Sequence, residues 1–165
     1  MASVGTTHTL IPHDGGDLLG FPEGVQDRFL VESATSGGSL ALVEHLLAPR
    51  ALAAPVHLHE REDEYSYVLE GRVGALLGDD EVEVAAGGVL VKPRGQWHTF
   101  WNPDDRPARV LEVIVPAGIE QLFRLLDGLD GWPEPEELER LAARFGARLD
   151  LAATSPLADR HDLRF

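Results

Sequence analysis

Two spaced runs of metal-binding side chains and turn formers constrain this 165-residue chain more than any other feature. The first run begins with His57 and His59, which one residue separates, and Glu64 follows after four more residues. Gly71 closes this run, and six residues separate it from Glu64. The second run has the fixed positions Gly87, Pro93, Gly95, His98 and Asn102. The 15 residues between the runs are enough chain for a pair of short strands and a turn.

The spacing predicts short strands joined by tight turns. Side chains alternate between the two faces of a strand, so His57 and His59 point the same way. The run 64–69 is typical of a second strand. The Pro-Arg-Gly sequence at 93–95 predicts a tight turn, after which His98 opens another strand. Hairpins of this kind that meet across a barrel would bring the three histidines and the glutamate together in its interior.

Three imidazoles and one carboxylate that converge form a donor set for a divalent transition metal. The ion could be Fe, Mn, Ni, Co, Cu or Zn, since imidazole suits most of these metals and the carboxylate keeps manganese among them. The expected metal ligands are His57, His59, Glu64 and His98. Glu64 has a second possible role, as a carboxylate that leaves the metal to accept a proton. The alternative is a vestigial site that binds nothing, which would leave buried polar groups without partners.

Both runs resemble the paired motifs of the cupin superfamily, whose members are small β-barrels that commonly hold one metal ion. The resemblance implies an all-β dominated chain, a cupin β-barrel (double-stranded β-helix or jelly roll) with C-terminal helices. It also implies a homodimer, because small cupins tend to pair through barrel strands. One position departs from the family pattern: Ala51 stands where a glycine often precedes the first histidine by six residues. That departure concerns a turn and touches no ligand.

Residues 115–123 and the helix that ends at 144–146 are similar to the tail of small bacterial single-barrel cupins. Some of those resemble quercetin 2,3-dioxygenases. The resemblance therefore implies a metal-dependent, quercetinase-like oxidoreductase of dioxygenase type that acts on a small enolisable or phenolic compound. Cupins with this ligand pattern also resemble isomerases, decarboxylases and lyases, so a cupin isomerase or decarboxylase is an alternative. A non-catalytic, metal-dependent small-molecule-binding cupin is the alternative from a different class.

Composition restricts the partners. The net charge of −14 disfavours nucleic acid and anionic membrane surfaces, because no basic stripe could neutralise phosphates. Lys92 is the only lysine, and the few cations near the motifs disfavour phosphorylated substrates. The absence of cysteine excludes disulfides and thiolate zinc sites, and residues 1–10 lack the pattern of a signal peptide. We expect a cytoplasmic protein whose partner is a small-molecule substrate or ligand.

The chain divides into three expected segments: N-terminal strands at the barrel edge over 1–38, the barrel core with both motifs over 39–117, and a C-terminal helical extension and tail over 118–165. Strands are expected over 6–11, 26–35, 39–47, 72–77, 81–85, 89–92 and 109–115. In the strand at 81–85, Val82 and Val84 are expected to face inward. Apolar residues recur at helical spacing over 119–126, and a second helix is expected over 135–145. The weakly patterned tail from Ala152 onward is expected to be partly disordered.

The alternation of side chains along a strand also suggests which residues form the walls of the site. Ser66, Val68 and Phe100 share a face with the expected ligands and are candidate substrate-pocket residues. Tyr65, Tyr67, Thr99 and Trp101 should face the other way, toward a second sheet or a subunit interface. His45 could line the cavity, and a hydrogen-bonded wall histidine is the simpler interpretation. We assign no role to His8, His13 and His161, which lie in expected loops and tails.

Overall fold

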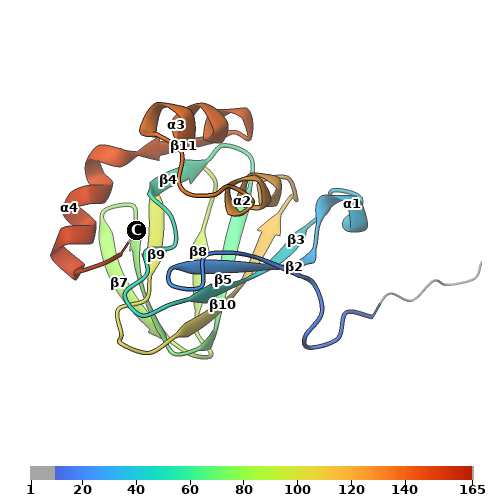
Figure 1. Cartoon of the computed structure of the whole chain (residues 1–165), viewed down its shortest axis with the longest axis horizontal. Coiled ribbons are helices and arrows are strands. Elements are labelled where there is room, and N and C mark those ends of the chain that lie inside the picture. The colour runs from blue at the N-terminus through green and yellow to red at the C-terminus, as the bar shows by residue number, and fades with distance from the viewer. Residues whose placement is uncertain (1–9, 165) are drawn as a thin grey trace, which may run out of the picture.

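Two antiparallel β-sheets with helices packed against them make up the fold (Figure 1). The structure is a computed structural model that describes residues 10–164. The first sheet has the strand order β1 (Asp17–Gly20), β2 (Val25–Val31), β3 (Ala41–Leu47), β10 (Ala108–Val115), β5 (Asp63–Glu70) and β8 (Val89–Lys92). The second has the order β11 (Ala147–Asp150), β4 (Val56–His59), β9 (His98–Trp101), β6 (Arg72–Leu77) and β7 (Asp80–Ala85). Strands distant in sequence lie side by side, which is the jelly-roll arrangement expected from the two motifs.

Alternating side chains build the core between the sheets. Along β10 the exposed fraction falls to zero at Val110 and Ile114, while Arg109 points to solvent. Val68 on β5 and Val73 on β6 are likewise fully buried and pack in the same cluster as Val110. The alternation fixes the register, because a slip of one residue would expose this face. The inward face therefore determines which polar side chains enter the barrel.

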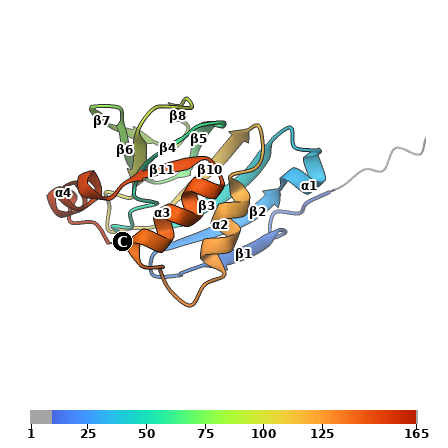
Figure 2. The same ribbon diagram turned by 90° about the horizontal axis from the view of Figure 1, so that it is seen from above.

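Helices α2 (Glu120–Asp127) and α3 (Pro135–Arg144) follow the last barrel strand, as the apolar spacing predicts. Figure 2 shows them lying next to each other over β2 and β3. Their buried residues Leu122, Leu141 and Ala142 pack in one cluster with Phe29 and Val43. Pro135 suits the first helical turn because a proline lacks the N–H that would be unpaired there. The two helices thus cover one side of the first sheet.

The structure corrects the prediction for the C-terminal tail. Residues 147–150 form strand β11, which pairs with β4, and Leu151–His161 form helix α4. The Asp150 side chain caps α4 by accepting a hydrogen bond from the Ala153 N–H at 2.9 Å. Leu157 packs against Trp101 on the outer face of the second sheet. The helix has few apolar residues and an internal proline, which is why its pattern is weak.

Three smaller expectations also change. The strand expected over 26–35 ends at Val31, and a short helix, α1 (Ser33–Ser36), precedes a turn in which Gly37 has φ 66°. Val82 is exposed, because β7 is the edge strand of its sheet, whereas Val84 packs against the core. The strand expected over 6–11 lies mostly outside the described residues, and residues 10 and 11 are not in a strand.

The outward-facing residues behave as period-two counting predicts. Tyr65 and Tyr67 are exposed on β5, where they pair in register with Val91 and Val89 of β8. Trp101 faces outward from the barrel but is covered by α4. The expected homodimer stays a prediction. Within residues 10–164, no helix is long and apolar enough to cross a bilayer.

Candidate metal centre and adjoining cavity

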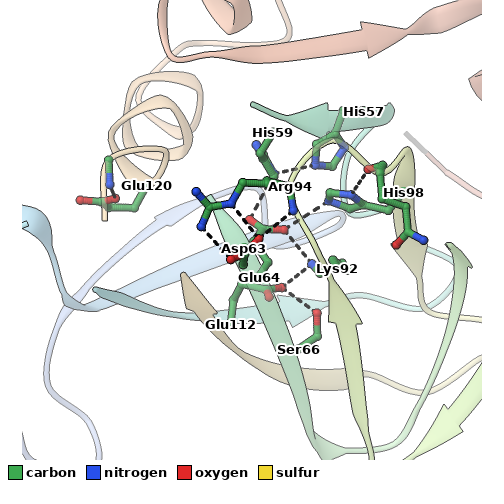
Figure 3. Close-up of polar contacts among 12 residues, drawn as sticks. His57, His59, Asp63, Glu64, Ser66, Lys92, Arg94, His98, Glu112 and Glu120 are labelled. Atoms are coloured by element: carbon green, nitrogen blue, oxygen red, sulfur yellow. Dashed lines mark hydrogen bonds and ion pairs between the residues drawn. The ribbon is translucent and has the colours of Figure 1, made fainter. Parts of the chain in front are cut away.

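Both sheets contribute to the candidate metal centre. His57 and His59 lie on β4, and His57 pairs in register with His98 of β9 in the same sheet. Glu64 comes from β5 of the other sheet. Figure 3 shows the four side chains pointing toward one another in the space between the sheets. The structure thus brings together all four residues that the spacing predicts as ligands.

The four residues form a tight, buried cluster. Their candidate ligand atoms all lie within 4.8 Å of one another. His59 Nε2 lies 3.2 Å from His57 Nε2 and 3.2 Å from Glu64 Oε1, and His98 Nε2 lies 3.3 Å from Glu64 Oε2. Each of the four is less than a tenth exposed. Atoms at these separations can share one small cation.

Backbone carbonyls orient two of the imidazoles. His57 Nδ1 lies 2.7 Å from the Pro55 oxygen, and His98 Nδ1 lies 2.9 Å from the Gln96 oxygen. A carbonyl only accepts hydrogen bonds, so each Nδ1 carries the hydrogen and each neutral ring offers the Nε2 lone pair to the centre. With its hydrogen on Nδ1, the buried His98 Nε2 faces the Glu64 oxygen as a second acceptor, and no residue within 10–164 donates a hydrogen bond to it. These residues therefore fit a divalent metal ion.

The electrostatics of the centre favour the neutral forms of His57 and His98. Burial, followed by the charges of His98 and His59, lowers the pKa of His57 well below its ordinary value. Burial also lowers the pKa of His98. Burial opposes ionisation of Glu64, but Lys92 and His59 outweigh it and lower the pKa of that carboxyl well below its usual range. Neutral histidines and an ionised carboxylate are the states in which these side chains bind metals.

A buried ion-pair network supports the centre, and the sequence analysis did not predict it. Lys92 Nζ lies 2.9 Å from Glu64 Oε2 and 2.8 Å from Glu112 Oε2. The Ser66 hydroxyl donates to the same Glu112 oxygen at 2.8 Å. Lys92 and Glu112 are almost completely buried, and Lys92 also stacks over the Phe100 ring at 4.7 Å from its centroid. The only lysine of the chain thus links a candidate ligand to a second buried carboxylate (Figure 3).

A cavity of about 310 Å³ adjoins the centre. Its walls are mostly apolar, with side chains from the barrel and from α2 and α3, and its polar groups are mainly histidines and carboxyls. The lining includes Phe21, Val25, Leu52, Phe100, Leu122, Phe123, Leu126, Leu138, Leu149 and Arg164, together with Glu23, Asp27, His45, His57, His59, Glu64, Glu112 and Asp127. Its size and walls suit a small organic molecule with a few oxygen atoms.

The predicted pocket residues divide between the cavity and the core. Phe100 lines the cavity. Ser66 and Val68, on the same face of β5 as Glu64, are fully buried and do not line it. Ser66 binds Glu112, and Val68 belongs to the apolar core. Side chains of α2 and α3 form these walls instead. The alternation of residues along a strand cannot predict where those helices lie over the barrel.

A second polar group lies in the cavity, away from the four-residue cluster. His45 lines the cavity and also forms a hydrogen bond to Asp27, through Nδ1 and Oδ1 at 2.6 Å. Asp127, at the end of α2, lies near this pair. Burial and the charge of Asp27 raise the pKa of Asp127 to about 8. Of these three residues, only His45 is recognised as a cavity candidate from the sequence.

Comparison with known proteins agrees with the geometry. The family model described as "Cupin domain" matches residues 43–114. The structure of KdgF from Halomonas sp. superposes with a TM-score of 0.58 and 21% identity, and the match covers 70% of this chain and 99% of that one. Residues 43–114 of this chain form a cupin domain, and the chain has the cupin fold.

Two curated relatives match this cupin over part of their length. The tetracenomycin polyketide synthase protein TcmJ of Streptomyces glaucescens is 28% identical over 94 residues, which is 57% of this chain and 63% of that protein. A germin-like protein, subfamily 2 member 3, of Arabidopsis thaliana is 36% identical over 120 residues, or 68% of this chain and 52% of that protein. The matches thus span less than two thirds of either relative.

Turn residues of the cupin motifs have the conformations that the sequence predicts. Gly71, between β5 and β6, has φ 79°, and Gly95 has φ 77°. The Asn102 side chain accepts a hydrogen bond from the Asp104 N–H at 3.0 Å and donates to the Arg106 carbonyl at 2.7 Å, so it holds the turn after β9. These contacts fix the strands that carry the ligands. They add no group to the site.

His13 and His161, two of the histidines to which we assign no role, lie outside the cavity. His13 is almost fully exposed next to Asp14. His161 lies 2.7 Å from Glu81 and stacks on Trp101. His8 lies outside the described residues.

Proposed function

We propose that this cupin is a metal-dependent oxidoreductase of dioxygenase type that acts on a small enolisable or phenolic compound. The observation that carries the proposal is a buried donor set of three histidines and one glutamate at the wall of a mostly apolar cavity. Four protein ligands leave coordination positions for oxygen atoms of a bound molecule. Apolar walls exclude water from that molecule.

The charges of the cavity support a substrate without phosphate. Its lining includes five carboxyl side chains, Glu23, Asp27, Glu64, Glu112 and Asp127, and one arginine, Arg164. A phosphorylated substrate would meet this acidic lining without a cluster of arginines to hold it. The relative from Streptomyces glaucescens is named a polyketide synthase protein. Polyketides carry β-dicarbonyl and phenolic oxygens, which are good chelating groups and agree with the proposed class.

Each residue of the centre has a distinct part in this proposal. His57, His59, Glu64 and His98 would hold the ion. A bound divalent metal supplies Lewis acidity and a template for a substrate oxygen. Lys92 holds Glu64 at one oxygen, since its Nζ contacts Oε2 at 2.9 Å. The other oxygen, Oε1, faces His59 at 3.2 Å.

The contact between Glu64 and Lys92 favours one alternative, a non-catalytic cupin that binds a small molecule through its metal. A carboxylate that is paired with a buried ammonium is a weak proton acceptor, so the contact suits a ligand better than a base. In a binding protein the same cluster would hold the ion, and no proton transfer to Glu64 would be needed. The cavity is the same for both functions.

Loading with individual metals, followed by substrate screening, tests the proposal. We would express the protein with Fe, Mn, Ni, Co, Cu or Zn, measure the bound metal by elemental analysis, and titrate flavonols, diketones and catechols under argon. An oxygen electrode then records uptake after air is admitted. We expect about one metal per chain, metal-dependent binding of a chelating compound, and oxygen uptake with at least one of the redox-active metals.

The outcomes separate the two functions. Metal-dependent binding without oxygen uptake, for every metal and compound, would contradict the dioxygenase and support the binding protein. Failure to retain any metal would contradict both, because each depends on the four-residue cluster. A His57→Ala/His98→Ala variant is the negative control for metal content.

A further inference from the structure

The cavity contains a second polar site, formed by His45 and Asp27. Asp27 on β2 pairs in register with His45 on β3, and both are at least nine-tenths buried. The imidazole lies between two aromatic side chains, with ring centroids 5.5 Å from Phe100 and 5.9 Å from Phe123. Both rings also line the cavity. The His45 ring is therefore held in one orientation before any ligand enters.

One nitrogen of His45 is bound and the other is not. Nδ1 forms the 2.6 Å hydrogen bond to Asp27 Oδ1. The carboxylate nearest Nε2 in the described part of the chain is Glu112, whose Oε2 is 3.8 Å away and too distant for a hydrogen bond. That oxygen already accepts from Ser66 and Lys92. Nε2 thus borders the cavity without a hydrogen-bond partner among residues 10–164.

The surroundings of His45 favour its cationic form. Burial lowers the pKa of His45, but the carboxylates of Asp27 and Glu112 outweigh burial and raise the pKa to about 8. Lys92 acts in the opposite direction from β8, and Asp127 of α2 faces Asp27 from the other side. At neutral pH, Nε2 is then an N–H donor in a mostly apolar space. A buried donor without an acceptor is unfavourable, and an oxygen atom of a ligand would satisfy it.

Buried charges connect this site to the candidate metal centre. Glu112 faces His45 on one side and binds Lys92 on the other, and Lys92 contacts the candidate ligand Glu64. The charges alternate in sign from Asp27 through His45, Glu112 and Lys92 to Glu64. Asp27 and Glu64, at the two ends of this series of contacts, line the same cavity, and apolar walls lie between them. A molecule that fills the cavity can therefore present oxygen atoms to both ends.

We infer that the His45–Asp27 pair is a second binding point, at which the Nε2–H of His45 donates a hydrogen bond to an oxygen of a ligand chelated at the four-residue cluster. The inference rests on the proposed function, since it requires that the cavity binds a chelating compound. It narrows the ligand class to largely apolar molecules that carry a phenolic, enolic or carbonyl oxygen away from their chelating pair. Asp27 is a positioning residue, because it orients the ring and contacts no ligand.

Two flavonols test the inference. Quercetin carries hydroxyl groups away from its chelating 3-hydroxyl and 4-carbonyl, whereas 3-hydroxyflavone has only the chelating pair. Binding to metal-loaded protein is measured by absorbance under argon. We expect His45→Gln to weaken quercetin binding about ten- to a hundredfold, the loss expected for one charge-assisted hydrogen bond. It should change the affinity for 3-hydroxyflavone less than about threefold, with metal content unchanged.

Matched variants separate positioning from packing. His161→Gln removes another histidine that contacts a carboxylate, outside the cavity, and should affect neither flavonol. Asp27→Asn should weaken quercetin binding, as His45→Gln does.

Nitrogen-15 NMR of the zinc-loaded protein tests the charge of His45 without any ligand. His45 should titrate near pH 8 in the wild type and at a lower pH in Asp27→Asn.

Three results would overturn the inference. They are an equal loss of affinity for both flavonols in His45→Gln, unchanged quercetin binding in that variant, and a neutral His45 at pH 7 by NMR. A failure of the proposed function looks different, because flavonol affinity would then be the same with and without metal. Absence of binding of both flavonols to the metal-loaded wild type would overturn both.

Discussion

The two ends of the cavity differ in how the chain builds them. At the metal end, His57 and His59 share one strand, and Glu64 and His98 follow within two short motifs. At the far end, Asp27 and His45 come from neighbouring strands and Asp127 from a helix. The first end is encoded by spacing along the chain, and the second by how separate elements pack. Functional groups of the second kind escape a search for motifs.

The two ends also differ in charge balance. The centre gathers three imidazoles around one carboxylate, and His98 Nε2 receives no hydrogen bond from residues 10–164, so the cluster suits a cation. The far end is balanced internally, because Asp27 pairs with His45. Removal of a single side chain should therefore have different effects at each end, which the following predictions test in order of decreasing effect.

Loss of a candidate ligand should have the largest effect. His98→Ala is expected to lower the affinity for metal by more than a hundredfold, because loss of an outer contact to a ligand already costs ten- to a hundredfold. The melting temperature of the variant should no longer rise with added metal, since stabilisation by a bound ion depends on its affinity. Elemental analysis and thermal unfolding measure both effects. His45→Gln should retain metal, and equal loss of metal in both variants would contradict the distinction between the two ends.

Removal of Lys92 should have the next largest effect, because this residue joins the two ends. Lys92→Met leaves Glu64 and Glu112 buried without their shared cation, which should destabilise the fold by about 3–5 kcal/mol. Urea unfolding with EDTA measures the loss in metal-free protein. The double variant Lys92→Met/Glu112→Gln also removes one of the two buried carboxylates, so it should recover part of the lost stability. Strictly additive effects in the double variant would contradict the network.

Arg72→Met is the matched control for that experiment. Arg72 contacts Glu83 and Asp104 on the surface, where solvent screens the pairs. We expect little change in stability. A loss comparable to that of Lys92→Met would show that ion pairs in general, and not burial, determine the effect.

Particular residues show how far the sequence could predict these regions. The four candidate ligands follow from strand alternation and turn residues, and the structure brings them together. The inward position of Glu112 could also have been found, since it lies two residues from both Val110 and Ile114, which are buried on the same face of β10. Lys92 likewise shares a face with Leu90. Alternation shows that such a residue is buried, but it does not show its partner on another strand.

The far end of the cavity and the tail could not be predicted in this way. Asp127 reaches the Asp27–His45 pair because α2 packs over β2 and β3 through Leu122. No local pattern gives the position of a helix on a sheet. Helix α4 depends similarly on Leu157 packing against Trp101, a contact between residues distant in sequence.

The smallest expected effect is a change in the pH dependence of stability at the far end. The pKa of Asp127 is raised from 3.8 to about 8, first by burial and then by Asp27, so the folded state keeps a proton that the unfolded chain loses. The contribution of Asp127 to stability should therefore fall as pH rises from about 4 toward 8. Asp127→Asn removes this titration, because asparagine is always neutral. The upper limit of the change in slope is about 1.4 kcal/mol of unfolding free energy per pH unit. We expect a smaller change, because solvent reaches part of the carboxyl.

Between pH 4.5 and 6.5 the comparison of variants isolates Asp127, because the lowered pKa values of His57 and His98 affect the wild type and the variants alike. His45, with its pKa raised to about 8, removes stability only as the pH rises above its ordinary value of 6.5. Glu64, with a lowered pKa, removes stability only as the pH falls below its ordinary value of 4.5. Across this interval, the free energy of unfolding in urea should fall less, or rise more, with pH for Asp127→Asn than for the wild type and for the exposed control Asp130→Asn. Identical slopes in the three proteins would mean that Asp127 is ionised in the folded state, and that the cavity end it shares with Asp27 and His45 carries an additional negative charge.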